Sequence, residues 1–398
     1  MPDVSIYNIC CQAGRNANDI VRKAYQMTDS SVIKGWFNSE KSGHIADNQQ
    51  SAVDSEKRSS SKLSHKRITF NYVCRELVWK FGRWKTKSLK QFIDEVKPDI
   101  IYLPIYSSGY MVDIQKYVIR LAKVPVVGHI SDELYAYTDS WLASPFKNLY
   151  RSWIRKKIRE IIKTISYGEV FAKGMASEYS QIFKRSFYVI GKGVREKDIS
   201  PNSEYTVGST VDFVFTGNYG GERGRQLVEL ARQMNDCCKS SIRKPRLLIY
   251  STTHAEDEIN RKLTETGCVV FKGAVYGNDL RDVQRRADFL VHVEGFEPKA
   301  IKATRYSFST KIIDYLLAQR PIFAIGPNCV NSIKVLSENH MAIVSSNTAS
   351  LRDNLERIGV DKIDTEAIIA NGLKYLRTER NIDNIQAEML ERFKILVL

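Results

Sequence analysis

The stretch Val211-Asp-Phe-Val-Phe-Thr-Gly-Asn-Tyr-Gly-Gly-Glu-Arg-Gly224 joins an apolar run to a glycine-rich turn and then to a helical pattern. A second stretch, Phe308-Ser-Thr-Lys-Ile-Ile-Asp-Tyr-Leu-Leu-Ala-Gln-Arg-Pro-Ile-Phe-Ala-Ile-Gly326, opens a helix on hydroxyl residues and leads into a buried strand. Helix N-termini carry about half a positive charge and point free backbone N–H groups outward, so they attract phosphate. Two such turns, with Arg223, Lys311 and Asp314 around them, suggest a nucleotide-sugar site.

Short apolar runs alternate with helical patterns on both sides of these stretches. In the second half the runs predict strands over 212–216, 246–250, 269–272, 289–293, 322–325 and 342–344. In the first half we expect strands over 4–10, 97–104, 124–130, 164–167 and 187–194, and a helix that starts over 18–25. Strands separated by helices favour parallel sheets with crossover connections, so the predicted fold class is α/β.

Two polar segments interrupt this alternation. Residues 38–66 include Ser-Glu-Lys-Arg-Ser-Ser-Ser-Lys and almost nothing to bury, which predicts a flexible loop. Residues 195–209 are polar, contain Pro201-Asn-Ser, and are typical of a linker between domains.

The composition indicates a globular protein. Of 398 residues, 43% are hydrophobic and 10% aromatic, and this length allows two domains with ample cores. No run of about 18 apolar residues occurs, so we expect no transmembrane helix. The start of the chain lacks the features of a signal peptide. The seven cysteines include no Cys-x-x-Cys spacing, which predicts a reducing, cytoplasmic location without metal chelation by cysteine.

The formal net charge of +15 is compatible with nucleic acid, an anionic membrane or phosphorylated substrates as partners. Residues 80–90 carry five cations and no acid, and residues 151–163 carry six cations against one acid. In the second segment a tryptophan and four isoleucines recur at helical spacing, as in a basic amphipathic helix that lies on anionic lipid. The alternative is a helix whose apolar face packs inward and whose basic back is solvated, and both can hold at once. The residues predicted to face a membrane are Lys80, Arg83, Trp84, Arg151, Trp153, Arg155, Lys156 and Lys157.

Four motifs follow one another along the chain. They are Lys97-Pro-Asp-Ile-Ile-Tyr; Gly174-Met-Ala-Ser-Glu-Tyr followed by Phe187-Tyr-Val-Ile-Gly-Lys-Gly-Val194; Leu280-x-x-x-Gln284-x-x-Ala-Asp-Phe-Leu-Val291; and Lys311-Ile-Ile-Asp-Tyr-Leu-Leu-Ala-Gln-Arg-Pro-Ile-Phe-Ala. In order and spacing they resemble the motifs of retaining nucleotide-sugar glycosyltransferases with the GT-B fold, of the group 1 or family 4 type.

This resemblance implies two Rossmann-like domains that face each other across a cleft. The acceptor-binding domain would span 1–195 and the nucleotide-sugar-binding domain 196–380, and a helix over 381–398 would cross back to the first domain. By position in the motifs, the donor would contact Gly217, Asn218, Gly220, Gly221, Arg223, Glu294, Ser309, Thr310, Lys311 and Asp314.

The chain departs from the family's pattern at two positions. Asn218 replaces the first of two donor-phosphate cations, and Arg223 stands in the place of the second, where its guanidinium can still grip phosphate. The family's two glutamates map onto Tyr306 and Asp314, so a carboxylate for the ribose hydroxyls is kept and the one for the donor sugar is lost. Glu294 or Glu297 could substitute for it.

Each of these residues also has a purely structural interpretation. Gly217 to Gly221 could form an ordinary strand-to-helix turn. Ser309 and Thr310 are common capping residues, and Asp314 favours the dipole at a helix start. Lys311 has no such explanation, because the dipole disfavours a cation there, and a nearby anion would account for it.

The acceptor side offers candidates for catalysis. Asp132 and then His129 are the predicted proton acceptors, because they follow a strand in the acceptor half. A buried strand histidine and a turn-capping aspartate are the alternatives. Gly14 is predicted to let a substrate approach the backbone, with Arg15 and Gln12 as weaker candidates beside it. No metal-binding cluster stands out, so we expect no metal and no cofactor, with cations and helix N-termini neutralising the diphosphate.

These observations predict a cytoplasmic glycosyltransferase bound peripherally to the inner face of a membrane. It would move a sugar from a UDP- or GDP-sugar to a lipid-linked or polysaccharide acceptor in the biosynthesis of cell-surface glycans. A GT-B-like sugar-nucleotide epimerase is the first alternative, and a non-catalytic basic nucleic-acid-binding protein is the second. No nucleic-acid-binding signature appears, so we expect no nucleic-acid partner.

Overall fold

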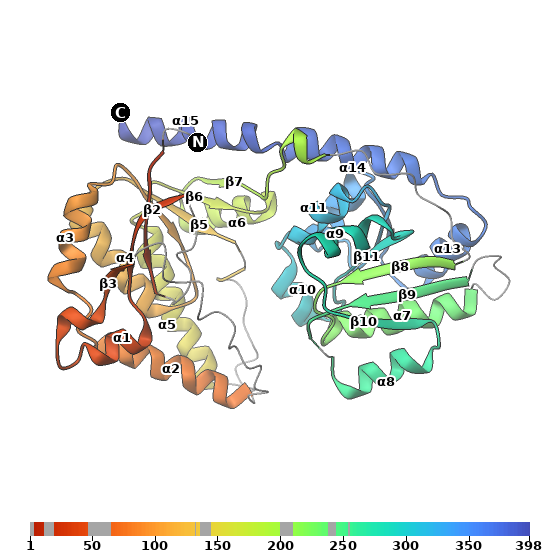
Figure 1. Cartoon of the computed structure of the whole chain (residues 1–398), viewed down its shortest axis with the longest axis horizontal. Helices are drawn as coiled ribbons and strands as arrows, with labels where there is room; N and C mark the ends of the chain where they lie inside the picture. Colours follow the sequence, from red (N-terminus) through yellow and green to blue (C-terminus); the bar gives the residue numbers. More distant parts are fainter. Residues whose placement is uncertain are drawn as a thin grey trace.

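The computed structural model arranges the chain in two α/β lobes that lie side by side (Figure 1). The first lobe runs from red to yellow in that view and the second from green to blue. The chain is therefore of the predicted α/β class. The structure describes residues 4–11, 20–46, 65–131, 133–135, 145–199, 210–237, 244–253 and 255–398, without the side chains of 65–72 and 145–147.

The second lobe is built on six parallel strands in the order β10-β9-β8-β11-β12-β13. The strands predicted from sequence are all present, with bounds that differ by a few residues at most. Because the strands are parallel, their carboxyl ends meet at one edge of the sheet, which is where open α/β sheets bind ligands. The strands are β8 Thr210–Thr216, β9 Lys244–Tyr250, β10 Val269–Gly273, β11 Phe289–Val293, β12 Ile322–Ile325 and β13 Ala342–Ser345.

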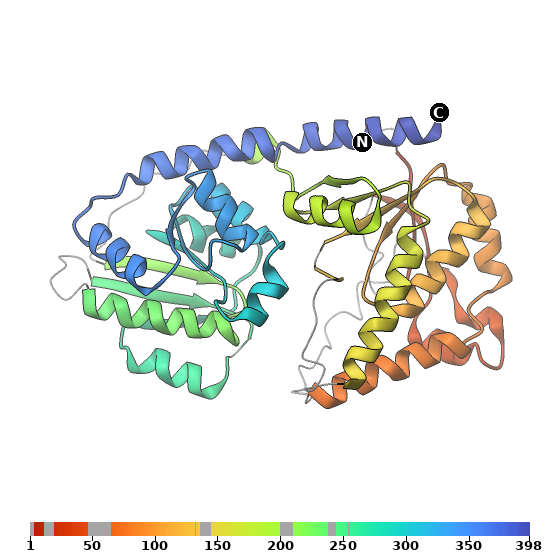
Figure 2. The same ribbon diagram turned by 180° about the vertical axis from the view of Figure 1, so that it is seen from behind.

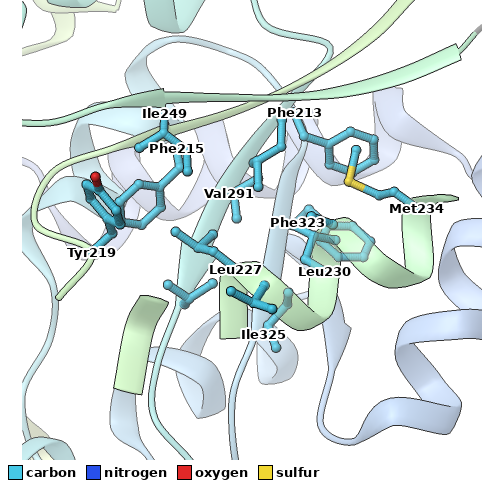
Figure 3. Packing of buried hydrophobic residues seen from close by; sticks show 14 of the residues in the cluster. Phe213, Phe215, Tyr219, Leu227, Leu230, Met234, Ile249, Val291, Phe323 and Ile325 are labelled. Atoms are coloured by element: carbon cyan, nitrogen blue, oxygen red, sulfur yellow. The ribbon is translucent and has the colours of Figure 1, made fainter. Parts of the chain in front are cut away.

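Helices cover both faces of this sheet, so its central strands, β11 and β12 above all, are apolar on both faces. Phe213 and Phe215 point to one face, where they join a core with Leu227 (Figure 3). Val214 points to the other face and packs in a second core with Ile312. The helices are α7 Glu222–Cys237, α8 Asp257–Glu265, α9 Gly277–Arg285, α10 Pro298–Thr304, α11 Thr310–Leu317, α12 Asn331–Glu338, α13 Thr348–Gly359 and α14 Thr365–Glu379.

The first lobe holds a parallel sheet in the order β4-β5-β6-β7 and a three-stranded sheet in the order β1-β2-β3. The strands are β1 Ile6–Cys10, β2 Val21–Gln26, β3 His44–Ala46, β4 Ile101–Pro104, β5 Val126–Ile130, β6 Tyr167–Val170 and β7 Phe187–Val189. The helices are α1 Asp29–Lys34, α2 His65–Phe81, α3 Lys87–Val96, α4 Gly109–Ala122, α5 Pro145–Ile162 and α6 Lys173–Phe183, with short 3-10 helices at Ser39–Ser42 and Glu196–Asp198.

The helix predicted to start over 18–25 is wrong. The segment instead contains β2, which pairs with β1 on one side and β3 on the other. Its Tyr25 is fully buried, and the phenol oxygen lies 2.9 Å from the hydroxyls of both Thr86 and Ser88. Strand pairing and this buried contact outweigh the weak local helical pattern.

The flexible loop predicted over 38–66 is wrong at its beginning. There a 3-10 helix, Ser39–Ser42, leads into β3, which pairs antiparallel with β2. Gly43 passes so close to Tyr25 that a Cβ at this glycine would lie 2.6 Å from the ring. The segment is thus held by backbone pairing and close packing on a tyrosine. Residues 47–64 lie outside the described part of the chain.

The apolar side of α5 faces the core of the first lobe. Ile154, Ile158, Ile161 and Ile162 are buried in one cluster with strands β4 to β7. Trp153 differs, since it is 38% exposed. The inward-facing alternative is therefore correct for the isoleucines, and the basic back of the helix is left on the outside.

Two segments run side by side between the lobes. Val194 pairs with Asn381 in an isolated parallel bridge, and the Val194 N–H donates to Arg380 O at 2.6 Å. From there α15, Ile382–Val397, extends over the first lobe (Figures 1 and 2). Its Arg392 lies 3.7 Å from the buried carboxylate of Glu169, and its Phe393 packs edge-on against Tyr102.

Candidate active site

Charged side chains gather at the carboxyl edge of the second-lobe sheet. Lys311, in the first turn of α11, donates from Nζ to Thr216 O at 2.9 Å. Arg223, in the first turn of α7, places Nη2 3.7 Å from Oε2 of Glu294, the residue that directly follows β11. The structure thus brings together three residues predicted to bind the donor, and we call them the Arg223–Glu294–Lys311 cluster.

Gly217 creates the space that Lys311 occupies. Its φ is +121°, a conformation that residues with a Cβ rarely adopt. A Cβ at this position would lie 2.7 Å from Lys311 Nζ. The first glycine of the turn is therefore required both by its backbone and by the ammonium group packed against it.

The pKa of Lys311 is lowered to about 8. Burial is the main cause, since it disfavours the charged form, and the nearby positive charge of Arg223 acts in the same direction. Glu294 opposes both effects. The ammonium also lies 4.9 Å from the centroid of the Phe215 ring. A half-buried cation with so little compensating negative charge favours the approach of an anion.

Glu294 is 3% exposed and is the acid of the cluster. Burial alone would raise the pKa of its carboxyl group, but His292, Arg223 and Lys311 together lower it. Oε1 lies 3.3 Å from His292 Nε2. Glu297 is exposed at the start of α10, so of the two glutamates proposed to replace the one missing at position 306, only Glu294 lies with the cations.

Buried hydrogen bonds fix α11 to the sheet. The Tyr315 hydroxyl lies 3.0 Å from the hydroxyl of Thr216 and donates to Val291 O at 3.2 Å. Tyr315 is fully buried, so its position is determined by β8 and β11 rather than by solvent. These contacts hold the start of α11 at the end of β8 and thereby set the position of Lys311.

Several backbone N–H groups predicted to bind phosphate already have partners. The Gly220 N–H donates to Asn218 Oδ1 at 2.8 Å, and the Gly221 N–H to Glu256 Oε2 at 3.2 Å. At the start of α11 the Ser309 N–H donates to Ser332 Oγ, whereas the side chain of Ser309 makes no capping bond to this helix. The first turn of α11, including Thr310, is therefore the better candidate for backbone binding of an anion.

Asp314, one turn after Lys311 in α11, borders a hollow of about 610 Å³. Gly277, Leu280 and Gln284 line the same hollow. The Asp314 carboxylate accepts a hydrogen bond from Lys192, which belongs to the segment leaving the first lobe. The hollow therefore presents a carboxylate, several cations and apolar side chains, and it borders the same helix, α11, whose first turn carries Lys311.

Tyr306, where the resemblance expects a glutamate, points at the first lobe. A Cβ at Gly174, in α6, would lie 3.0 Å from its ring. The neighbouring Arg305 donates to both carboxylate oxygens of Glu178 at 2.9 and 3.0 Å, and its Nη2 lies 3.6 Å from Glu133. Residues 305 and 306 thus bind the two lobes together, and this contact occupies the position of the missing glutamate.

The predicted catalytic residues are only partly described. His129 lies in β5, where its ring stacks on Tyr102 at 5.9 Å and meets Phe171 edge-on at 5.0 Å. Burial lowers the pKa of the imidazole below its usual range, which favours the neutral form. Its Nδ1 is buried without a hydrogen-bond partner among the described residues. Asp132, Gly14, Arg15 and Gln12 lie outside the described part of the chain, so the catalytic assignments stay predictions.

The residues predicted to face a membrane have different environments. Trp84 is 5% exposed and donates from Nε1 to Trp79 O, so its predicted exposure is wrong: a buried indole cannot reach lipid. Arg155 donates to Tyr135 O, and Lys157 pairs with Asp113, so both are engaged within the lobe. Arg151 is half-buried and Trp153 partly exposed, whereas Lys80, Arg83 and Lys156 are exposed.

Sequence reasoning missed two residues at the site. Lys192 stands in a Gly-Lys-Gly segment that had been assigned only as the end of the first domain, yet it pairs with Asp314. Arg305 carried no local signal, because its partners Glu133 and Glu178 are far away in sequence. Both residues act between the lobes, a relationship that a pattern within one element cannot reveal.

Two properties concern the described residues as a whole. Within them, no helix is long and apolar enough to cross a membrane. Nor do three or more histidine, cysteine, aspartate or glutamate side chains of this described part gather in a geometry suited to a metal ion.

Comparisons with known proteins place this architecture. Neither the scan against protein-family models nor the search of curated proteins gave a match. Among solved structures, a glycosyltransferase from Rickettsia africae aligns with a TM-score of 0.58 at 11% identity, over 99% of this chain and 98% of that one. The chain has the GT-B fold.

Two further GT-B structures agree with this assignment. Sucrose-phosphate synthase from Thermosynechococcus elongatus gives a TM-score of 0.57 at 13% identity, covering 81% of this chain and 79% of that chain. HepE of Anabaena, in complex with UDP, gives 0.56 at 14% identity, covering 77% and 81%. At these identities the likeness establishes the GT-B fold, and function has to be argued from the site.

Proposed function

We propose that the protein is a glycosyltransferase that takes its sugar from a nucleotide diphosphate donor. The observation that carries the proposal is the Arg223–Glu294–Lys311 cluster, at the sheet edge where GT-B proteins and other open α/β folds bind ligands. The positive charge of the half-buried Lys311 is only partly compensated by Glu294, and a bound diphosphate would supply the remaining negative charge. The solved GT-B neighbours, which are glycosyltransferases by description, support the assignment.

A UDP-sugar is the first donor to test, because the HepE structures contain UDP and UDP-glucose. In this proposal the diphosphate lies between Arg223 and the first turn of α11, with Lys311 beside it. The nucleoside enters the hollow next to Asp314, whose carboxylate accepts hydrogen bonds from the ribose hydroxyls in place of Lys192. Glu294 takes the role of the glutamate missing at position 306 and contacts the sugar.

The reaction breaks the bond between the anomeric carbon and the diphosphate oxygen, which leaves with the electron pair. The acceptor hydroxyl oxygen forms the new bond to that carbon, and its proton passes to the departing phosphate, with Asp132 or His129 as alternative acceptors. Arg223 and Lys311 stabilise the charge on the leaving group, as preorganised cations do in other transferases. Retention of configuration and independence from metal ions belong to this proposal.

For the acceptor we propose a lipid-linked or polysaccharide substrate of cell-surface glycan assembly, reached at the inner face of a membrane. The basic back of α5 and the exposed Lys80 and Arg83 support association with an anionic surface. One structural neighbour, WaaG, is a glycosyltransferase involved in lipopolysaccharide biosynthesis. The basic surface supports the proposed location, and the role of this neighbour supports the proposed acceptor.

The donor site is tested by calorimetric titration of UDP, GDP, dTDP, ADP and CMP into the protein. UDP should bind, and Arg223→Ala combined with Lys311→Ala should weaken binding by about 100-fold or more, because each charge-assisted hydrogen bond contributes about 1.5–3 kcal/mol. Lys362→Ala, an exposed lysine of the same lobe, is the matched control. Unchanged affinity in the double variant would refute the site, and release of UDP that depends on an added acceptor would demonstrate transfer.

A further inference from the structure

A large hollow lies away from the donor site, in the first lobe. It is a groove of about 920 Å³ bordered by α2, α4 and α5. Its volume falls within the roughly 300–1,000 Å³ of pockets that hold small organic ligands. The donor site is in the other lobe, so this groove has no part in binding the nucleotide.

The buried rings of Trp79, Trp84 and Tyr110 form the floor of the groove. Trp79 stacks on Tyr110 with centroids 4.8 Å apart, and Trp84 meets Tyr117 edge-on at 5.5 Å. Trp79 also donates from Nε1 to Asp29 at 2.6 Å. Stacking and hydrogen bonding hold these rings in place, so the groove is a built feature of the lobe.

Exposed apolar side chains line two sides. On α2, Val73, Leu77 and Phe81 follow one another at intervals of four residues, on one side of the helix, and Phe81 is 68% exposed. On α5, Leu149 and Trp153 have the same spacing, and Leu149 is 64% exposed. Val73, Leu77 and Trp153 line the groove itself, and Phe81 and Leu149 extend the two rows by one turn.

Basic side chains outnumber acidic ones in the groove, and only some of them form ion pairs. Six basic and two acidic side chains line it, and two of the basic ones, Lys116 and Lys157, pair with Glu160 and Asp113. The other four are Lys80, Arg83, Lys85 and Arg120, and within the described part of the chain they are exposed and have no acidic partner.

Aromatic rings hold part of this charge in position. Lys85 Nζ lies 5.3 Å from the centroid of Trp84 and 5.7 Å from that of Tyr117, and Arg120 Cζ lies 6.0 Å from Tyr117. Cations over aromatic rings are favourably placed and stay available to an anion from the solvent side. One groove therefore combines an anion-binding group of side chains with two apolar rows.

We propose that this groove binds an anionic phospholipid of the bilayer. The lipid phosphate contacts Arg83, Lys85 and Arg120, and an acyl chain lies along Val73, Leu77 and Trp153. The inference rests on the membrane association proposed above and deepens it, from attraction to a charged surface to a discrete lipid site. It adds to the basic back of α5 a defined groove that α5 shares with α2 and α4.

A lipid fits the groove better than other anions do. A free phosphate would leave the apolar rows exposed to water. Single-stranded nucleic acid is usually held by stacking of bases on exposed aromatic rings. Trp79 and Trp84 are buried, and the exposed Phe81 and Trp153 stand in rows with aliphatic side chains rather than as a series of stacking platforms. An amphiphile with one phosphate uses both the cations and the apolar rows.

Flotation of the full chain with vesicles tests the proposal. Vesicles of phosphatidylcholine with phosphatidylglycerol should bind the protein at low salt, and pure phosphatidylcholine vesicles should not. Arg83→Gln with Lys85→Gln should weaken binding about 10- to 30-fold, since each basic residue near an anionic surface contributes roughly one factor of five. Leu77→Ser should weaken it as well, through loss of apolar contact. The matched control is Lys362→Gln with Lys374→Gln, two exposed lysines of the second lobe.

Short-chain lipid distinguishes a discrete site from general attraction. Dihexanoyl-phosphatidylglycerol below its micellar concentration should bind by calorimetry, more tightly than glycerol phosphate or inorganic phosphate. That difference should disappear in Leu77→Ser. Unchanged UDP affinity and circular dichroism in each variant show that the fold is intact.

The outcomes separate the two proposals. If vesicles bind but the groove variants and the control behave alike, the groove is wrong and membrane association stands. If no vesicles bind, both the groove and membrane association are refuted, while UDP binding still tests the transferase. Binding of an oligonucleotide in preference to anionic vesicles would also overturn the lipid assignment.

Discussion

The affinity for the donor nucleotide should depend on the protonation of Lys311. The pKa of this lysine is about 8 in the nucleotide-free protein, because burial and Arg223 disfavour its charge. It is therefore about nine-tenths protonated at pH 7 and about one-tenth at pH 9. If only the ammonium form binds the diphosphate, the apparent affinity for UDP should fall about tenfold between these two pH values.

Calorimetry of UDP binding from pH 6.5 to 9 measures this dependence. Lys311→Arg serves as the control, because a guanidinium stays charged over the whole range, and its affinity should change little with pH. Lys311→Met should bind weakly at every pH. A wild-type affinity that is constant between pH 7 and 9, or a decline of equal size in Lys311→Arg, would show that another group controls binding.

Four further outcomes are expected. In the absence of nucleotide, Lys311 should make the free energy of unfolding rise between pH 8 and pH 10. Its pKa in the folded protein lies below the unfolded value of 10.5, so in this range the unfolded chain binds more protons than the folded one. Urea unfolding of wild type and Lys311→Met checks this. Gly217→Ala should cost about 1 kcal/mol or more and weaken UDP binding, since it introduces a Cβ at positive φ against Lys311; an unchanged urea midpoint would contradict it. Arg305→Ala should increase the radius of gyration measured by X-ray scattering, because the two lobes lose an ion pair that joins them, and adding Glu178→Ala should have little further effect. A radius of gyration equal to that of the wild type would argue against the contact. Ile158→Ala should destabilise the first lobe by about 2–5 kcal/mol, and a loss below about 0.5 kcal/mol would place α5 outside the core.

Much of the second lobe could be predicted from sequence. Most strands there are short apolar runs with residues buried on both faces, and such a run is visible without knowledge of its neighbours. The same reasoning located Arg223, Lys311 and Glu294, because each stands at the end of a strand or the start of a helix. Residues at such positions meet at one edge of a parallel sheet whatever the exact packing.

Parts of the first lobe could not be predicted from local sequence patterns. Tyr25 belongs to a strand because Thr86 and Ser88 bind its hydroxyl inside the lobe, and no local pattern encodes that contact. Trp84 stands among five basic residues and was expected at the surface, yet its indole is buried and bonded to Trp79 O. In both segments, packing against distant elements determines the result, and intrinsic propensity is a weak guide.

Contacts between the lobes could not be predicted from the sequence either. Tyr306 could be recognised as a departure from the family's pattern, but not as a residue that packs on Gly174. The same holds for Lys192 and its bond to Asp314. Such contacts depend on how two separately folded units meet, which periodicity within one unit does not determine.

A crystal structure of the protein with UDP tests the central claim most directly. We expect the diphosphate to lie within hydrogen-bond distance of Lys311 Nζ and the Arg223 guanidinium. We also expect a ribose hydroxyl to donate to Asp314 while Lys192 moves away. UDP bound elsewhere, or bound with Lys311 still directed only at Thr216 O, would contradict it.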